Sequence, residues 1–203
     1  MRKLFGPLWL AWVGLVGPVA AAPASAPSAP PAQEAAGVWN PQSRIDAQRE
    51  AMKALAFMDG AWRGRAQTEQ MPSGFVHTER SGPLLDASVR LIEGRSYDEK
   101  GATRFNAFAV ISYDPARRAY SMRSYALGYA GDFPLTVRPD GYSWTQPAGP
   151  GAVIRYVATV KGGEWVEIGH RSVGDGVPEK VFEMRVRRIG STNWPQDDAV
   201  GPR

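Results

Sequence analysis

The sequence predicts a mainly β protein, a ten-stranded antiparallel up-and-down β-barrel preceded by one α-helix. Helical periodicity is confined to residues 41–58, and from Gly60 onward short runs rich in β-branched and aromatic residues recur between Gly, Asp and Pro. The breaks between these runs are short, which favours pairing of successive strands as antiparallel neighbours. Ten such strands favour a closed sheet because closure removes exposed edges, and a two-sheet sandwich is the alternative.

The helix is expected to begin at Asn40-Pro41, with Asn40 as the N-cap and Pro41 at the first helical position. A rough apolar stripe that includes Leu55 faces one way, and charged residues face the other. Asp59-Gly60 is a termination signal, so the helix is predicted to end near Met58.

The ten strands are predicted from runs of strand-forming residues separated by turn signals such as Asp114-Pro115, Asp140-Gly141, Gly162-Gly163 and Asp175-Gly176. They are expected near residues 61–68, 74–81, 86–93, 104–113, 119–127, 133–138, 141–145, 152–160, 164–172 and 180–188.

The last two predicted strands show the clearest alternation of apolar and charged residues, which is typical of a sheet with one buried face. On each strand the more apolar face is expected to be the buried one. These faces carry Phe182, Met184 and Val186 on the last strand, and Val166, Ile168 and His170 on the strand before it.

The first 21 residues have the parts of a Sec-type signal peptide. Met1-Arg2-Lys3 is charged, residues 4–19 are apolar, and Val19-Ala20-Ala21 supplies the small residues before a cleavage site near Ala21. The alternative is a membrane anchor, but the apolar run is short of the ~20 residues that span a bilayer. We therefore expect a periplasmic or secreted protein with no integral membrane segment after cleavage.

The rest of the chain divides by composition. Residues 22–39 form a Pro/Ala-rich linker, residues 40–189 the barrel domain with its N-terminal helix, and residues 190–203 a flexible tail. The formal charge is +4, and two of those cations, Arg2 and Lys3, leave with the signal peptide. The remaining charge is too weak to indicate nucleic acid as a partner. The chain has no Cys, so it has no disulfides. The oligomeric state stays open.

Three segments carry a family resemblance. The run Gly60-Ala61-Trp62-Arg63-Gly64 after a short helix resembles the calycin superfamily, which includes the lipocalins. Together with residues 110–114 and 182–188 it is similar to an uncharacterised family of bacterial lipocalin-like proteins, the DUF1579 group, over roughly residues 55–189. The resemblance implies that Trp62 packs across one end of the barrel and that Gly60 and Gly64 are structural.

The sequence also resembles the nitrobindins, calycins that bind haem through a His near the chain end. This chain has only two His, His77 and His170, and neither lies on the last predicted strand. His170 shares a face with Ile168, so the resemblance makes it a candidate haem ligand in the barrel. His77 is expected at the barrel rim or surface, with Glu79 as the one acid at strand spacing from it.

The candidate ligand-binding residues are polar side chains inside strands that otherwise read as buried. Arginines in a barrel interior would pair with an anionic ligand such as a fatty acid, whereas on the outer face they would be solvated. The spacing leaves both faces open. The set comprises Arg90, Arg123, Tyr125, Arg155 and His170.

Known catalytic motifs are absent, so no catalytic or metal-binding residue is assigned. The sequence favours an exported, non-enzymatic lipocalin-like protein that binds a small apolar or amphipathic molecule in the barrel. The alternatives are haem binding through His170 and an uncharacterised enzyme with a site in the barrel. No cofactor other than that haem is expected.

Overall fold

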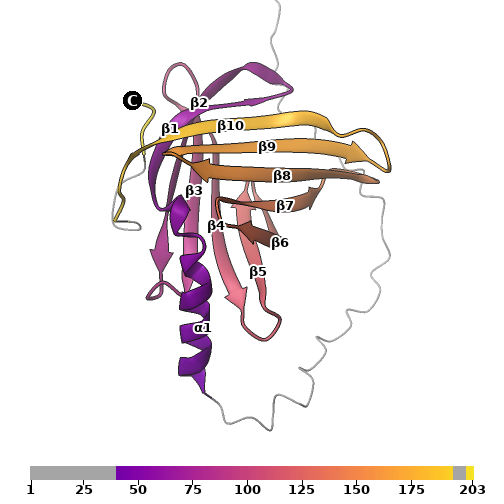
Figure 1. Cartoon of the computed structure of the whole chain (residues 1–203). Coiled ribbons are helices and arrows are strands. Elements are labelled where there is room, and N and C mark those ends of the chain that lie inside the picture. The colour runs from indigo at the N-terminus through magenta and orange to yellow at the C-terminus, as the bar shows by residue number, and fades with distance from the viewer. Residues whose placement is uncertain (1–39, 194–199) are drawn as a thin grey trace, which may run out of the picture. The chain divides into compact units, whose positions relative to one another are not determined.

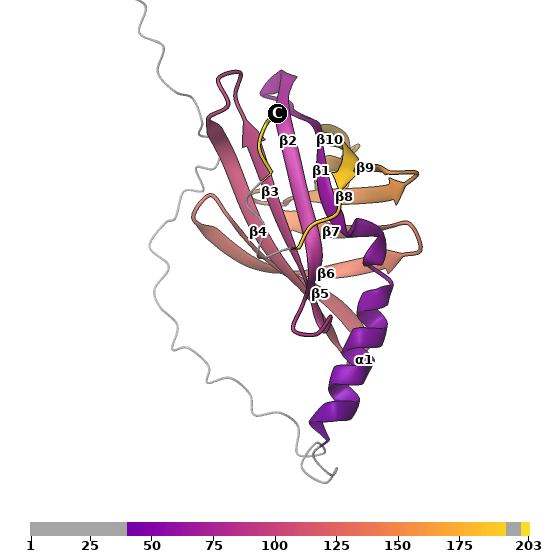
Figure 2. The same ribbon diagram turned by 90° about the vertical axis from the view of Figure 1, so that its left-hand side faces the viewer.

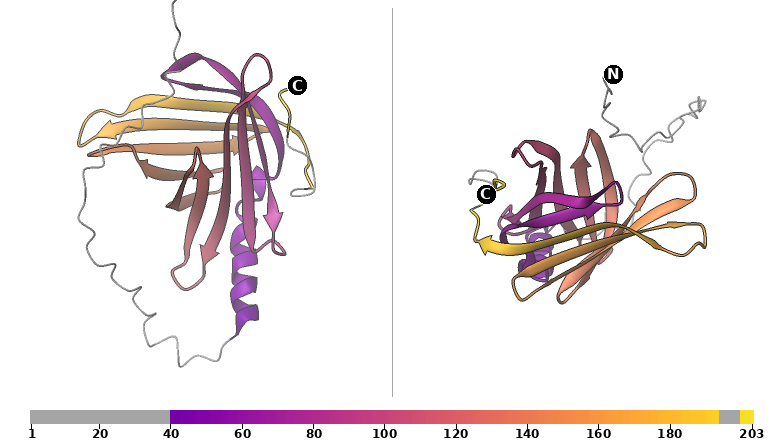
Figure 3. Two further views of the ribbon diagram at one scale, coloured as in Figure 1. Left: turned by 180° about the vertical axis from the view of Figure 1, so that it is seen from behind. Right: turned by 90° about the horizontal axis from the view of Figure 1, so that it is seen from above.

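Ten antiparallel strands close into a barrel in which each strand pairs with its neighbours in the chain and the last pairs with the first (Figure 1). The structure is a computed structural model that describes residues 40–193 and 200–203. The predicted signal peptide and linker, residues 1–39, lie outside the described residues. Figure 3 shows the strands from behind and from above. The up-and-down barrel prediction is confirmed, and the sandwich alternative is wrong.

The strand positions follow the prediction closely. Strand β2 is longer than expected because it pairs with β1 from Met71 and with β3 as far as Leu84. The strands are β1 Gly60–Thr68, β2 Met71–Leu84, β3 Val89–Tyr97, β4 Thr103–Asp114, β5 Ala119–Ala126, β6 Tyr129–Arg138, β7 Gly141–Pro147, β8 Ala152–Lys161, β9 Glu164–Val173 and β10 Glu179–Gly190.

Helix α1 (Pro41–Lys53) begins as predicted, with the Asn40 side chain accepting a hydrogen bond from the Ser43 amide at 3.2 Å. It ends earlier than predicted, and a separate 3₁₀ turn, η2 (Ala56–Met58), follows. The break allows Leu55 and Met58 to reach the barrel core, where neither side chain is exposed. Packing on the barrel therefore overrides local helical propensity here. No helix among the described residues is long and apolar enough to cross a membrane.

The helix and the 3₁₀ turn cover one end of the barrel (Figure 1). The Tyr120 hydroxyl donates to the Ala51 carbonyl at 2.8 Å, and the Trp62 indole donates to the Met58 carbonyl at 3.0 Å. Trp62 is fully buried and meets Trp165 edge to face, with ring centroids 5.7 Å apart. Trp62 thus lies across the covered end.

Gly60 and Gly64 allow β1 to approach β10 closely. Gly60 has a φ of +129°, which other residues rarely adopt. A Cβ at Gly64 would lie 2.2 Å from the Arg185 carbonyl oxygen. Both positions therefore favour glycine for steric and conformational reasons.

The last residues of the chain lie against the outer face of β2 and β3 (Figure 2). The carbonyl of Val200 accepts hydrogen bonds from the Thr78 hydroxyl at 3.3 Å and from the Tyr97 hydroxyl at 2.6 Å. Both Thr78 and Tyr97 are buried, although they face away from the barrel interior. Residues 200–203 of the predicted tail are thus in contact with the barrel.

The inward faces of the last two strands differ from the prediction in one case. Phe182, Met184 and Val186 face inward on β10, as predicted. Their partners across the β9–β10 ladder face the same way, because directly paired residues share a face. Those partners are Gly169, Glu167 and Trp165, so the expectation that Val166, Ile168 and His170 face inward is wrong.

Candidate functional site in the barrel interior

Five polar side chains gather on the inward face of the barrel, and we refer to them as the interior polar cluster: His77, Glu79, Ser96, Tyr142 and Glu167. Four of them are buried, and the Glu79 side chain is largely buried as well. Strands β2, β3, β7 and β9 supply them. Buried polar groups are costly unless they are hydrogen-bonded, so the partners of each one matter.

His77 lies between a hydroxyl and a carboxylate. Its Nδ1 is 2.8 Å from the Ser96 Oγ, and its Nε2 is 2.9 Å from the Glu79 Oε1. A carboxylate only accepts hydrogen bonds, so Nε2 carries the proton and Nδ1 accepts from Ser96 in the neutral ring. This arrangement fixes the orientation and tautomer of His77.

Glu167 and Tyr142 form the second part of the cluster. Each pairs with Ala158 on the intervening strand β8, whose small side chain leaves room for them to meet. The Tyr142 hydroxyl donates to the Glu167 Oε2 at 2.6 Å. Burial raises the pKa of Glu167 to about 7, and the nearby Glu79 carboxylate adds to the rise while Tyr142 opposes it. Burial also raises the pKa of Tyr142 well above its ordinary value.

Glu79 has an acceptor that nothing else in the described residues uses. Its Oε1 bonds to His77, but its Oε2 is buried without a hydrogen-bond partner. The carboxylate lies over Gly94, where an added Cβ would be 2.7 Å from Oε1. Gly94 therefore provides the space that this acid occupies.

Four inward-facing aromatic side chains form an aromatic wall beside the cluster: Phe133, Trp144, Tyr156 and Phe182. Trp144 and Tyr156 are stacked, with centroids 4.4 Å apart and planes 11° from parallel. Phe133 packs on Trp144 and Phe182 on Tyr156, at 5.1 and 5.7 Å. The Tyr156 ring lies over Gly169, where a Cβ would be 2.8 Å away.

The aromatic wall remains accessible to solvent. All four side chains are partly exposed even though they point into a closed barrel. They occupy the half of the strands away from α1 and η2. Hydrophobic walls that meet a few convergent polar groups are typical of small-molecule sites.

Arg90 is the one predicted ligand-binding residue that the structure places inside the barrel. It is 3% exposed, but it already forms an ion pair with Asp59, just after η2. Burial lowers the pKa of Arg90 to about 10. The Arg90–Asp59 ion pair thus links β3 to the segment that covers this end of the barrel. Asp59 neutralises the charge of Arg90.

Arg123, Tyr125 and Arg155, whose faces the spacing left open, lie on the outer face, so their candidacy as ligand-binding residues in the barrel interior is wrong. Arg123 donates to Asp132 at 2.5 Å and to the Tyr125 hydroxyl at 2.9 Å, and Tyr125 is 44% exposed. Arg155 is exposed on β8, between inward-facing neighbours. Apolar residues flank these positions on both faces of their strands, so alternation alone did not fix the direction.

The two histidines lie on faces other than the expected ones. His170 pairs with Arg155 on the outer face of the β8–β9 ladder, so it cannot ligate a haem in the interior. His77, expected at the rim or surface, is 4% exposed and faces inward. No group of three His, Asp or Glu side chains that could hold a metal ion occurs within residues 40–193 and 200–203.

Sequence reasoning missed most of the interior polar cluster. The sequence marks Glu79 only by its spacing from His77, and alternation places Glu167 on the face opposite Val166 and Ile168. The available signal was its neighbour Trp165, a large apolar residue two positions away and thus on the same face. Two glutamates on strands with apolar residues on both faces could not otherwise be told from surface charges.

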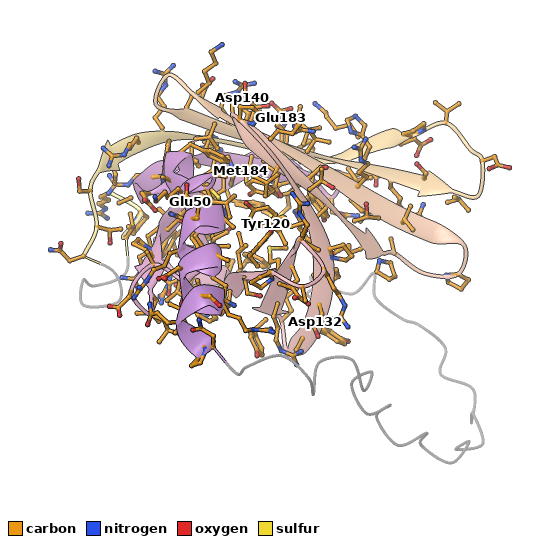
Figure 4. The ribbon with its side chains drawn as sticks, turned by 60° about the horizontal axis from the view of Figure 1, so that its bottom comes forward. Glu50, Tyr120, Asp132, Asp140, Glu183 and Met184 are labelled. Carbon is orange, nitrogen blue, oxygen red and sulfur yellow. The ribbon has the colours of Figure 1, made fainter. Side chains whose placement is uncertain are left out.

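A separate hollow of about 630 Å³ lies outside the barrel interior, between α1 and the β4–β5 hairpin. Figure 4 labels Glu50 on α1 and Tyr120 on β5, which line it. Its walls are Glu50, Arg118 and the two packed tyrosines Tyr113 and Tyr120, whose ring centroids are 4.8 Å apart. The hollow contains no member of the interior polar cluster.

Comparison with known proteins supports the fold alone. No family model matches the chain, and no curated protein matches it. Among solved structures, the crystal structure of Rv2717c from M. tuberculosis is similar, with a TM-score of 0.50 at 10% sequence identity. The match covers 68% of this chain and 96% of that one. At this identity the likeness concerns only the arrangement of the strands.

Proposed function

We propose that this protein binds a small apolar or amphipathic molecule inside its barrel, at the end away from α1. The observation that carries the proposal is the aromatic wall, which faces inward, remains partly exposed and adjoins buried hydrogen-bonding groups. Apolar side chains that solvent reaches inside a barrel cost free energy, which a bound apolar group would recover. The resemblance of residues 60–64 to the lipocalins supports the same proposal.

A fluorescence titration with N-phenyl-1-naphthylamine, a neutral apolar probe, tests this function. We expect saturable binding, and Trp144→Ala should weaken it by about tenfold because Trp144 supplies a stacking face. The matched control is Tyr125→Ala, since Tyr125 is an aromatic residue on the outer face. Absence of saturable binding, or an equal loss in both variants, would contradict the proposal.

We also propose that the chain is exported and processed near Ala21, on the evidence of residues 1–21. N-terminal sequencing of the protein isolated from its host tests this, with Ala22 expected as the first residue. A mature protein that retains Met1, or one found only in the cytoplasm, would exclude export.

Acyl-ester hydrolysis is a second candidate, favoured by the Ser96–His77–Glu79 line of hydrogen bonds. A hydroxyl, an imidazole and a carboxylate in this order can generate a nucleophile. Ser96 Oγ would bond to the ester carbonyl carbon while its proton passes to His77 Nδ1. That proton would then go to the departing alkoxide, and water would release the acyl group as an acid by the same steps.

Covalent labelling with a fluorophosphonate separates this candidate from simple binding. If Ser96 is a nucleophile, the label attaches to it, and Ser96→Ala abolishes both labelling and turnover of p-nitrophenyl butyrate. Ser112→Ala is the control, because Ser112 bonds to Ser121 on the exposed side of β4 and β5. Unlabelled wild-type protein would leave the hydrogen-bonded line with a structural role only.

A further inference from the structure

The charges that face the barrel interior are unbalanced. Within the described strands, the buried inward carboxyl groups are Glu79 and Glu167. The buried inward arginine, Arg90, is already paired with Asp59. Two further arginines share the inward register, but both are exposed at the barrel ends: Arg171 and Arg188. The ionisable groups buried in the interior therefore carry net negative charge.

One acceptor is left without a donor by the protein itself. The buried Oε2 of Glu79 has no hydrogen-bond partner among the described residues, while its Oε1 is held by His77. Leaving a buried carboxylate oxygen unpaired is costly, and a donor from a ligand would remove that cost. A ligand carboxylate would instead add a third negative charge beside Glu79 and Glu167.

Glu79 and Glu167 lie in the same part of the barrel interior. The ring of Trp165 links them, because it meets Trp62, which pairs with Glu79, and it also meets Tyr142, which bonds to Glu167. The stacked pair Trp144 and Tyr156 lies alongside, since Tyr156 pairs with Gly169, two residues from Glu167. Met184, which pairs with Glu167, is buried in the barrel core. Carboxylates together with accessible aromatic faces are a combination that attracts organic cations.

We propose that the interior site binds an amphipathic amine, with its ammonium group at Glu79 and Glu167 and its apolar tail along the aromatic wall. This inference rests on the proposed binding function and gives it a ligand class. It reverses the expectation of a fatty-acid carboxylate bound by arginines. The ammonium would donate to the free Glu79 Oε2 and to Glu167, and its charge would offset theirs.

Three probes with the same twelve-carbon tail test the head group: dodecylamine, dodecanol and dodecanoate, each used to displace N-phenyl-1-naphthylamine from the wild-type protein at pH 8 and below its micelle concentration. We expect dodecylamine to displace the probe at a concentration at least about tenfold lower than dodecanoate, with dodecanol between them. The comparison needs no variant, so it does not depend on a substitution that folds.

Variants then locate the head group. Glu79→Gln and Glu167→Gln should each reduce the preference for dodecylamine over dodecanoate by about tenfold. Glu183→Gln, on the outer face of β10, is the matched control and should leave it unchanged. Equal or tighter binding of dodecanoate would overturn the amine inference while the binding function stands. If N-phenyl-1-naphthylamine itself does not bind, the proposed function fails first and the amine inference with it.

Discussion

At the scale of single residues, Glu167 shows how a buried acid couples the site to stability. Its pKa is raised to about 7 by burial, whereas an unfolded chain leaves a glutamate near its ordinary value of 4.5. Between these values the unfolded state releases the proton and the folded state retains it, so rising pH favours unfolding. Burial of Glu167 in the interior polar cluster therefore lowers the free energy of unfolding near neutral pH.

Replacing Glu167 by Gln should remove this pH dependence. In wild type, the free energy of unfolding should fall by about 3 kcal/mol from this group as pH rises from 4.5 to above 7, and Glu167→Gln should lack that part of the fall. Urea denaturation of both proteins at pH 4.5 and pH 8 measures it. Because groups distant from Glu167 titrate alike in both proteins, parallel profiles would mean that Glu167 is not buried as an acid.

Two arginines that the sequence could not distinguish should behave differently. Arg90 is buried and paired with Asp59, so Arg90→Met should lower the free energy of unfolding by about 2 kcal/mol. Arg123 forms an exposed pair with Asp132, so Arg123→Met should cost less than about 1 kcal/mol. Chemical denaturation of the two variants at pH 7 compares them, and a larger loss for Arg123 would reverse our assignment of their faces.

At the scale of elements, the close approach of β1 to β10 depends on Gly64. A Cβ there would lie 2.2 Å from the Arg185 oxygen and 2.8 Å from the Val186 Cα, and backbone atoms cannot move aside cheaply. Gly64→Ala should therefore cost about 2 kcal/mol, as overpacking does. Gly190→Ala is the control, since no atom lies within 4 Å of its added Cβ, and it should change stability by less than about 0.5 kcal/mol. Calorimetry that shows no difference between them would contradict this packing.

The elements were predictable from local signals because turn chemistry and capping are local. Asn40 caps α1 as its sequence position indicates, and all ten strands lie where strand-forming runs were found. The end of α1 was not predictable, because the break before η2 exists to bury Leu55 and Met58 against distant strands.

At the scale of the whole molecule, the number of strands was enough to predict a closed barrel. The sequence did not predict which side chains face the barrel interior. The interior faces are set by register between strands, and one residue of shift reverses a face. In β9 the interior holds Glu167 and the outside holds Val166 and Ile168, which is the reverse of the usual pattern. An inverted strand of this kind is where a binding site departs from the rules of a core.

The end of the chain contacts the outer face of β2 and β3 through hydrogen bonds to the Val200 carbonyl. Tyr97→Phe removes one hydrogen bond to the Val200 carbonyl and should cost about 1 kcal/mol in the full-length protein. A chain that stops at Asn193 has already lost that acceptor, so the same substitution should cost almost nothing there. Chemical denaturation of the four proteins measures the coupling. An equal cost in both backgrounds would mean that residues 200–203 do not stabilise β3, the strand that carries Ser96 on its inward face.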